Sequence, residues 1–436
     1  MINLNNIKLS NEKLNPDNCW NIVLAGDFCP IMRFNNGCGI NELLNRTFSQ
    51  ELLNFVRGAD VAIVNMEGPV RSVATSISKS GPSIQLDSEA PAVLKAAGFN
   101  IVTLANNHIM DYSSVGLSKT LESCQASGLM VCGVGEDLEA AMSSVKLEVK
   151  GARIEIFNFC EQEFGVAKST YPGAAWISHP VALKNIATAA KRSDVVIVVA
   201  HGGIEEVPFS PVQRSLQLRQ FIDAGAALVV GHHPHVPQGW EKYGKGIIFH
   251  SLGNFLFDYS DGKRYPKTEW GIMLDARFSG KQLFEIKLVP VEMIENRTVD
   301  IMGKVHNMES HLQYLHKLSS IISDVCRALS YWQETAAYLW QTRYKSWLQR
   351  ACNPGLSSNK SIRSSIAKLF QRENLGPGNI MNAGIKDGLA CLNMFRNESH
   401  RWAIETALEV YTLDSKDLRT NETNEEFKKL LSWTEG

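Results

Sequence analysis

Residues 228–236 read LVVGHHPHV, an apolar run that leads directly into three histidines and a proline. The β-branched run is typical of a buried strand, and the glycine marks its end. His233 and His235 alternate across Pro234 on an extended segment, so they can present two imidazoles to neighbouring metal ions. This stretch therefore predicts a buried strand whose carboxyl end carries metal ligands.

Four other apolar runs, at 22–25, 61–64, 101–104 and 195–200, also read as buried strands. Polar side chains follow every one of these runs, in chain order Asp27, Asn65 with Glu67, Asn106-Asn107-His108 with Asp111, and His201. In open α/β sheets, ligands bind in the crevice at the carboxyl ends of the strands. These groups can therefore converge although they are far apart in sequence.

Each of these residues also has an ordinary structural explanation when it is considered alone. Asp27 can cap a helix, and Asn106 and Asn107 are typical turn residues. His201 can be a hydrogen-bonded core histidine, and Glu67 can lie in an exposed loop. The repetition of the pattern at five strand ends favours a shared site over five separate coincidences.

The candidate ligands at these strand ends are two carboxylates, one amide oxygen and three imidazoles. A mixed oxygen and nitrogen set without thiolate suits Mn²⁺, Fe²⁺ or Zn²⁺ better than Ca²⁺. A bridging carboxylate can hold two such ions about 3.5 to 4 Å apart, where they clamp a phosphoryl oxygen and activate water. The sequence therefore predicts one or two divalent metal ions, with two preferred.

Amphipathic segments separate the predicted strands, at 91–97, 115–126, 181–192 and 212–224. Alternation of this kind predicts a mixed or parallel sheet with helices packed outside it. Three further strand-like runs follow without intervening helices, at 247–249, 272–277 and 284–288. These runs could complete a second sheet.

The pattern becomes helical after residue 300, which predicts two domains, 1–300 and 301–436. Residues 308–350 carry apolar side chains three and four positions apart, namely Leu312, Leu315, Leu318, Ile322, Cys326, Leu329 and Trp332. This spacing gives one apolar helical stripe. Residues 353–360 are rich in Ser, Asn and Gly and interrupt it, and helical patterning resumes at 362. We expect the C-terminal helices to form a cap or to drive homo-oligomerisation.

Composition limits the partners and the compartment. The 436 residues are 44% hydrophobic and 20% charged, with a formal net charge of −1. These values fit a soluble globular protein and predict no strong attraction to nucleic acid or anionic lipid. The first twenty residues lack a signal-peptide pattern, and no run approaches the roughly 20 apolar residues of a membrane span. Nine scattered cysteines without a CxxC pair fit the cytoplasm.

Two other enzyme classes are disfavoured by missing motifs. The glycines of residues 133–135 lack the third glycine and the downstream acid of a dinucleotide-binding fingerprint. A serine hydrolase of the Gly-x-Ser-x-Gly type is disfavoured because that elbow is absent.

The ordered set of motifs resembles the CapA-type capsule synthesis proteins (PGA_cap), a branch of the calcineurin-like metallophosphoesterase superfamily. The motifs are GD at 26–27, NMEG at 65–68, LANNHIMDY at 104–112, AHGG at 200–203, GHHPHV at 231–236 and HSLGNFLF at 250–257. The resemblance runs from about residue 21 to about residue 258. It implies a four-layer αββα metallophosphoesterase-like sandwich, to which this chain adds a C-terminal helical appendage.

The resemblance implies two alternative functions. The first is a metal-dependent hydrolase that acts on a phosphoester or a related polymer bond. The second is a non-catalytic, metal-containing assembly or binding protein for capsular polymer (poly-γ-glutamate or polysaccharide). The implied partners are an anionic small molecule or polymer and other capsule biosynthesis proteins.

The resemblance also implies metal ligands. Asp27 and His235 bind the first ion, and Glu67 bridges both ions. The second ion is completed by Asn107, His201 and His233. The superfamily commonly opens with Asp-x-His, whereas here Cys29 follows Asp27 and Phe28. One first-site imidazole is therefore missing, and Cys29 is either a substitute thiolate ligand or a buried thiol.

Further roles follow from the same resemblance. His108 is the general acid or transition-state donor, and Asp111, one helical turn away, orients it. Asn65 supports the ligands from behind. The turn at 251–254 shapes the rim of the site, although Asn254 could be purely structural.

Three basic residues, Lys79, Arg71 and Lys263, are candidates for neutralising an anionic substrate. Each of them could equally be a solvated surface residue.

Overall fold

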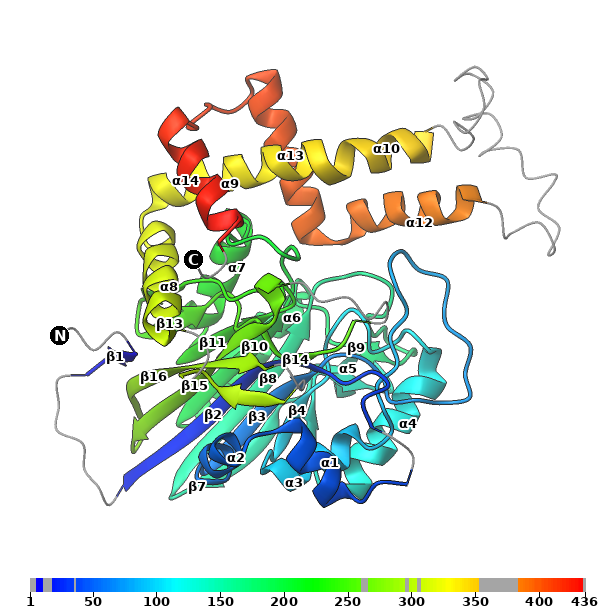
Figure 1. Ribbon diagram of the computed structural model, residues 1–436, viewed down its shortest axis with the longest axis vertical. Coiled ribbons are helices and arrows are strands. Elements are labelled where there is room, and N and C mark those ends of the chain that lie inside the picture. Colours follow the sequence, from blue (N-terminus) through cyan, green and yellow to red (C-terminus); the bar gives the residue numbers. More distant parts are fainter. Residues whose placement is uncertain are drawn as a thin grey trace.

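The computed structural model describes residues 5–10, 18–34, 37–259, 266–294, 298–303, 307–352 and 383–433. Two β-sheets pack face to face, and helices cover the outer face of each sheet (Figure 1). Further helices follow at the C-terminal end of the chain. The predicted four-layer αββα architecture with a helical appendage is confirmed. The predicted interruption at 353–360 lies outside the described residues.

The first sheet has the strand order β1-β16-β15-β2-β3-β4-β5, and β14 and β17 pair with β2 and β16. Its strands are β1 (Asn6–Lys8), β2 (Cys19–Cys29), β3 (Val61–Met66), β4 (Ile101–Thr103), β5 (Met130–Cys132), β14 (Asn254–Phe257), β15 (Trp270–Ser279), β16 (Gln282–Met293) and β17 (Val299–Ile301). Strands β2 to β5 are parallel, so their carboxyl ends lie at one edge of the sheet.

The second sheet has the order β12-β13-β11-β10-β8-β7. Its strands are β7 (Val145–Val149), β8 (Ala152–Cys160), β10 (Val195–His201), β11 (Leu228–His232), β12 (Trp240–Tyr243) and β13 (Gly246–Phe249). A separate small sheet pairs β6 (Val134–Gly135) with β9 (Gly173–Ala174). The five predicted ligand-bearing strands correspond to β2, β3, β4, β10 and β11.

The placement of the three later strands differs from the prediction. Residues 247–249 lie in β13 of the second sheet, but 272–277 and 284–288 lie in β15 and β16 of the first sheet. There β15 runs antiparallel to β2, with Leu274 opposite Leu24. Most of β15 is buried on both faces, so its sequence carries no alternation that would assign it to a sheet.

Side chains alternate between two cores along each central strand. Ile22 and Leu24 pack between the sheets, whereas Val23 and Ala25 pack under the outer helices. The helices on the first sheet are α1 (Ile40–Thr47), α2 (Gln50–Arg57), α3 (Ala90–Ala97) and α4 (Ser113–Ala126). Those on the second sheet are α5 (Leu138–Ala141), α6 (Pro180–Arg192) and α7 (Val212–Asp223). Burial on both faces explains the continuous apolar runs of these strands.

Two glycines at strand ends permit close approach of neighbouring loops. A Cβ atom on Gly26 would lie 2.1 Å from the carbonyl oxygen of Gly253, and one on Gly231 would lie 1.9 Å from that of His250. Any side chain at either position would push the adjacent loop away. The glycines that open the GD and GHHPHV motifs therefore bring backbone segments together at the ligand-bearing edge.

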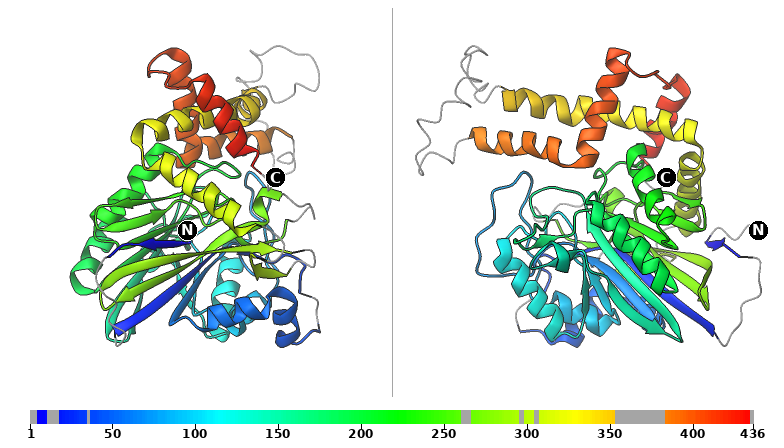
Figure 2. Two further views of the ribbon diagram at one scale, coloured as in Figure 1. Left: turned by 60° about the vertical axis from the view of Figure 1, so that its left-hand side comes forward. Right: turned by 180° about the vertical axis from the view of Figure 1, so that it is seen from behind.

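The C-terminal helices are α8 (Met308–Ile322), α9 (Val325–Leu339), a π-helical turn (Trp340–Tyr344), α10 (Lys345–Cys352), α12 (Ala383–Arg396), α13 (Glu398–Thr412) and α14 (Asn421–Leu431). Figure 2 shows that α9 to α14 gather over one end of the two sheets. Within the described ranges, no helix combines the length and the apolar character needed to cross a membrane.

The single apolar stripe predicted for 308–350 is interrupted between α8 and α9. The Asp324 carboxylate accepts a hydrogen bond from the backbone N–H of Arg327 at 3.1 Å and so caps a new helix. Leu312, Leu315 and Trp332 are buried as expected, but Cys326 is exposed. The prediction that Cys326 continues the apolar stripe was wrong, because the chain changes direction between α8 and α9, just before this residue.

Candidate metal centre

The six predicted ligands converge at the carboxyl ends of the central strands. They come from five strand ends: Asp27 in β2, Glu67 after β3, Asn107 after β4, His201 in β10, and His233 and His235 after β11. All are buried except Asn107, which is half-buried. Because the ligand-bearing strands are parallel within each sheet, residues far apart in sequence meet at one place.

The Glu67 carboxylate lies at the centre of the cluster. Its Oε1 is 3.7 Å from His201 Nε2, 3.8 Å from His235 Nε2 and 4.0 Å from His108 Nε2. Among the residues that the structure describes, neither Glu67 oxygen has a hydrogen-bond partner. Burial raises the pKa of Glu67 well above its usual range. A buried carboxylate with unsatisfied oxygens is costly, and a cation bound between it and the imidazoles would remove that cost.

Two overlapping groups have the geometry of metal ligands. The ligand atoms of Glu67, His201 and His233 lie within 4.8 Å of one another, as do those of Asp27, Glu67 and His235. Asn107 Oδ1 is 3.0 Å from His201 Nε2, which is about the separation of two ligands at right angles and about 2.1 Å from one ion. His233 Nδ1 likewise has no partner among described residues. The residues present therefore fit divalent cations, and Glu67 belongs to both groups.

Asp27 is held in its ionised form by three donors. Its carboxylate accepts hydrogen bonds from Asn65 Nδ2 at 2.8 Å, His232 Nδ1 at 2.8 Å and the His233 backbone N–H at 3.2 Å. Burial alone would raise its pKa, but His232 and the neighbouring histidines lower the pKa well below its usual range. Asn65 thus contacts a predicted ligand, and its supporting role stays a prediction. His232 was given no role from the sequence, although it belongs to the same histidine run.

The histidine turn has an unusual backbone. His233 and His235 adopt left-handed φ values of 98° and 59°, which cost roughly 1 to 2 kcal/mol for a residue with a Cβ atom. Such conformations persist where the surroundings fix them, and they gather at functional sites. The His233 ring centroid lies 5.0 Å from that of His201 and 5.8 Å from that of His235. The turn thereby places three imidazoles side by side.

Asn254 fixes the orientation of the His235 ring. Its Nδ2 donates to the carbonyl oxygen of Thr268 at 3.0 Å, so its Oδ1 accepts from His235 Nδ1 at 3.1 Å. The other ring nitrogen of His235, Nε2, then faces Glu67. Burial would lower the pKa of His235, but the Glu67 and Asp27 carboxylates raise it to about 10. Asn254, for which the sequence left a rim role and a structural role open, thus orients a predicted ligand.

His108 and Asp111 form a pair beside the cluster. His108 Nδ1 lies 2.7 Å from Asp111 Oδ2, and Asp111 also accepts from Lys79 Nζ at 2.6 Å and from the Ile84 backbone N–H at 2.8 Å. Burial would raise the Asp111 pKa, but His108 and Lys79 lower it below its usual value. Burial and Lys79 lower the pKa of His108. Near pH 7, His108 is therefore neutral, with its Nδ1–H donated to Asp111 and its Nε2 directed toward Glu67.

The basic residues behave differently from one another. Lys79 is buried and ion-paired with Asp111, so the solvated-surface alternative was wrong, and its role in neutralising an anionic substrate stays a prediction. It lies in a serine-rich loop without periodicity, which gave no signal of burial. Arg71 is exposed, with its Nη2 3.6 Å from Asp87. Lys263 lies outside the described residues.

Cys29 is buried at the end of β2. Burial, followed by the nearby Glu67 carboxylate, raises the pKa of its thiol well above the usual range. Cys29 is in none of the groups of closely spaced ligand atoms among the described residues, which favours the buried-thiol alternative over a thiolate ligand.

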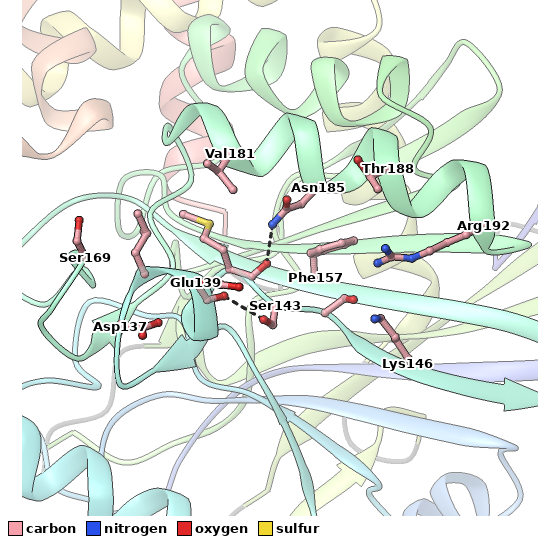
Figure 3. A pocket seen from close by; sticks show the side chains of 13 residues that line it. Asp137, Glu139, Ser143, Lys146, Phe157, Ser169, Val181, Asn185, Thr188 and Arg192 are labelled. Carbon is pink, nitrogen blue, oxygen red and sulfur yellow. Dashed lines mark hydrogen bonds between the residues drawn. The ribbon is translucent and has the colours of Figure 1, made fainter.

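A separate cavity of about 530 Å³ lies between α5, β7 and α6 (Figure 3). Its hydrogen bonds are local: Asn185 Nδ2 donates to the Met142 carbonyl at 3.1 Å, and Ser143 Oγ donates to that of Glu139 at 2.9 Å. No residue of the metal cluster lines it. The chemistry of the strand ends therefore does not extend into this cavity.

A known protein family matches the part of the chain that carries these strand ends. The family model "Bacterial capsule synthesis protein PGA_cap" matches residues 21–259. The capsule biosynthesis protein CapA of Bacillus anthracis is 33% identical over 273 residues, 59% of this chain and 65% of that protein. The PGA biosynthesis protein CapA of Bacillus subtilis (strain 168) is 35% identical over 209 residues, 46% of this chain and 54% of that protein. The chain thus spans about half to two thirds of these relatives.

Among solved structures, the 5'-nucleotidase of Candida albicans matches this chain with a TM-score of 0.38 and 12% sequence identity. The match covers 73% of this chain and 57% of that chain. A TM-score below 0.5 does not establish a shared fold. The four layers are shown by the two sheets of this chain and the helices that cover them. The family match is different in kind, since it covers more than half of the 436 residues and every ligand-bearing strand end. The chain belongs to the bacterial capsule synthesis protein PGA_cap family.

Proposed function

We propose that the chain is a metal-dependent hydrolase that cleaves a phosphoester or a related polymer bond. One observation carries this proposal. The buried Glu67 carboxylate has no hydrogen-bond partner among the described residues and faces the Nε2 atoms of His201 and His235. Two ions chosen from Mn²⁺, Fe²⁺ and Zn²⁺ suit this oxygen and nitrogen donor set.

The chain divides its ligands between two positions. Asp27, Glu67 and His235 would hold one ion, and the other would be held by Glu67, Asn107, His201 and His233. Bound ions of this kind polarise a phosphoryl oxygen and lower the pKa of water. Asn65, His232 and Asn254 keep Asp27 and His235 in the orientation that binding requires.

His108 would take up a proton from solvent at Nε2 and donate it to the leaving-group oxygen of the substrate, which returns the imidazole to its neutral form. Its Nδ1 is occupied by Asp111, so only Nε2 is available, and Nε2 lies 4.0 Å from Glu67 at the centre of the cluster. Asp111 holds the ring, and Lys79 keeps Asp111 ionised. A positioned imidazole of this kind contributes about 10² to 10⁴ in rate.

Metal removal should abolish hydrolysis. Protein stripped with a chelator is expected to lose at least about 10²-fold of its activity on bis(p-nitrophenyl) phosphate or p-nitrophenyl phosphate, and added Mn²⁺ should restore it. The Glu67→Gln protein, purified in parallel, controls for contaminating phosphatases. Equal rates for the stripped and the Mn²⁺-loaded protein would refute the proposal.

The second function, a non-catalytic binding protein for capsular polymer, also has specific support. The relatives carry capsule and PGA biosynthesis names, and Cys29 supplies no imidazole at the first position. Tyr411 and Leu413 of the C-terminal helical region are 84% and 85% exposed, which leaves an apolar surface for a second copy or another capsule protein. Metal-dependent binding of poly-γ-glutamate or polysaccharide without turnover would favour this function.

A further inference from the structure

A third group of ligand atoms lies beside the proposed pair of metal positions. It consists of Glu205, His233 and His235, whose ligand atoms lie within 4.8 Å of one another. We propose that Glu205 is an additional metal ligand, which provides an oxygen donor at a centre that lacks the first-site imidazole. The inference rests on the proposed metal centre and adds to it a residue and a role for the C-terminal helices.

The Glu205 carboxylate is available for a cation. The residue is half-buried, and its side chain makes no hydrogen bond or ion pair with other residues in the described part of the chain. His233, its neighbour in the group, has a buried Nδ1 without a partner in the same part of the chain. A carboxylate and an imidazole nitrogen that both lack partners and lie this close together are suited to one divalent ion.

The backbone around Glu205 is bound to the histidine turn on both sides. The Gly202 N–H donates to the carbonyl of His232 at 3.0 Å, and the Glu206 N–H donates to that of Pro234 at 2.9 Å. Gly203 has φ +125°, and a Cβ atom there would lie 3.1 Å from the Pro234 ring. The loop from β10 thus follows the turn between His233 and His235 closely, which fixes where the Glu205 side chain begins.

The C-terminal helices hold the same loop from the other side. Ile204 and Val207, which flank Glu205 and Glu206, are almost fully buried in one cluster with Trp332, Leu339 and Tyr344 of the C-terminal helical region. Burial of these two branched side chains stabilises the contact between the loop and the helices. The helices beyond the family match therefore position a residue at the metal centre.

A second contact ties α13 to the loop that follows β8. The Glu398 carboxylate at the start of α13 accepts hydrogen bonds from the Gln162 backbone N–H at 3.0 Å and from the Trp176 indole N–H at 2.7 Å. Ser399 Oγ donates to Glu161 at 2.6 Å, and Glu161 in turn accepts from the Gly203 N–H at 3.3 Å. This chain of hydrogen bonds runs from α13 to the loop that carries Glu205.

The donor set defines the ion that Glu205 favours. With Asp27, Glu67 and Glu205, the centre has three carboxylates, and no cysteine belongs to any of the ligand groups among the described residues. Carboxylate-rich sites suit Mn²⁺, whereas thiolate selects Zn²⁺. Mn²⁺ is therefore the appropriate probe.

The test compares two neighbouring glutamates. Glu205→Gln removes the charge without changing the shape, and Glu206→Gln makes the same change at an exposed neighbour that belongs to none of the three groups. Mn²⁺ binding to metal-stripped protein is measured by calorimetry, and the visible spectrum of the Co²⁺-loaded protein reports the ligand set. We expect Glu205→Gln to weaken at least one Mn²⁺ binding event by at least about 10-fold and to change the Co²⁺ spectrum. Glu206→Gln should match the wild type.

The outcomes separate this inference from the proposed function. Equal Mn²⁺ affinity and identical Co²⁺ spectra for Glu205→Gln and the wild type would overturn the Glu205 assignment and leave the other ligands in place. Equal losses in the Glu205 and Glu206 variants would also overturn it, because a general charge effect would then explain both. A wild-type protein that binds no Mn²⁺ would overturn both the assignment and the metal centre.

Discussion

Exchange of Glu67 for glutamine is expected to remove bound metal and to lower kcat/KM for an aryl phosphodiester by at least about 10²-fold. Changes behind a metal ligand already cost about 10- to 100-fold in affinity or activity, and Glu67 belongs to two of the three ligand groups. Glutamine has the same shape as glutamate, so loss of the fold would not explain the loss of metal.

The same substitution should not destabilise the metal-free protein and should increase its stability at neutral pH. Burial raises the Glu67 pKa in the folded state, so the unfolded state releases this proton at lower pH than the folded state does. As pH rises from about 4.5 toward the folded pKa, Glu67 therefore destabilises the metal-free fold, and glutamine removes this penalty. The stripped Glu67→Gln protein should melt at or above the wild-type temperature at pH 7.

Metal content by mass spectrometry, steady-state kinetics and melting of the stripped protein measure these effects together. Glu139→Gln, at an exposed position, is the matched control. A Glu67→Gln protein with wild-type metal content and wild-type rate would contradict the assigned bridging role.

Removal of the His108 imidazole should have the second large effect, and it should act on catalysis alone. His108→Ala is expected to lower kcat by about 10² to 10⁴, the range for a positioned acid or base, which is roughly 3 to 5 kcal/mol of transition-state stabilisation. Metal content should remain at the wild-type value, because His108 is in none of the three ligand groups.

Asp111→Asn provides an independent test of the pair. It should also lower kcat, because the amide cannot hold His108 Nδ1–H and the Lys79 ammonium as the carboxylate does. His179→Ala, at the start of α6, is the histidine control. If His108→Ala loses metal along with activity, His108 is a ligand. If its rate equals that of the wild type, the proton-transfer role is excluded.

The convergence of the ligands was predictable because its determinants are local. Each buried strand appears in the sequence as a short β-branched run, and the side chains that follow it are visible at once. Parallel pairing then brings the ends of β2, β3 and β4 together, and likewise those of β10 and β11. No long-range information was needed to name Asp27, Glu67 or His233.

Other features depend on contacts that leave no mark in the local sequence. Lys79 is buried against Asp111 and His108, and a serine-rich loop does not predict such contacts. From the sequence, the C-terminal helices were predicted only to form a cap or an oligomer contact. The packing of Ile204 and Val207 against Trp332 could not be predicted, because it joins segments more than 120 residues apart. Glu205 could have been found, because it follows the strand that ends at His201 by four residues.

Anomalous diffraction from crystals grown with Mn²⁺ tests the central claim most directly. The account predicts two ions on either side of Glu67, each about 2.2 Å from a Glu67 oxygen, one also bound by Asp27 and His235 and the other by His201 and His233. A map with no ion bonded to Glu67, at saturating Mn²⁺, would contradict it.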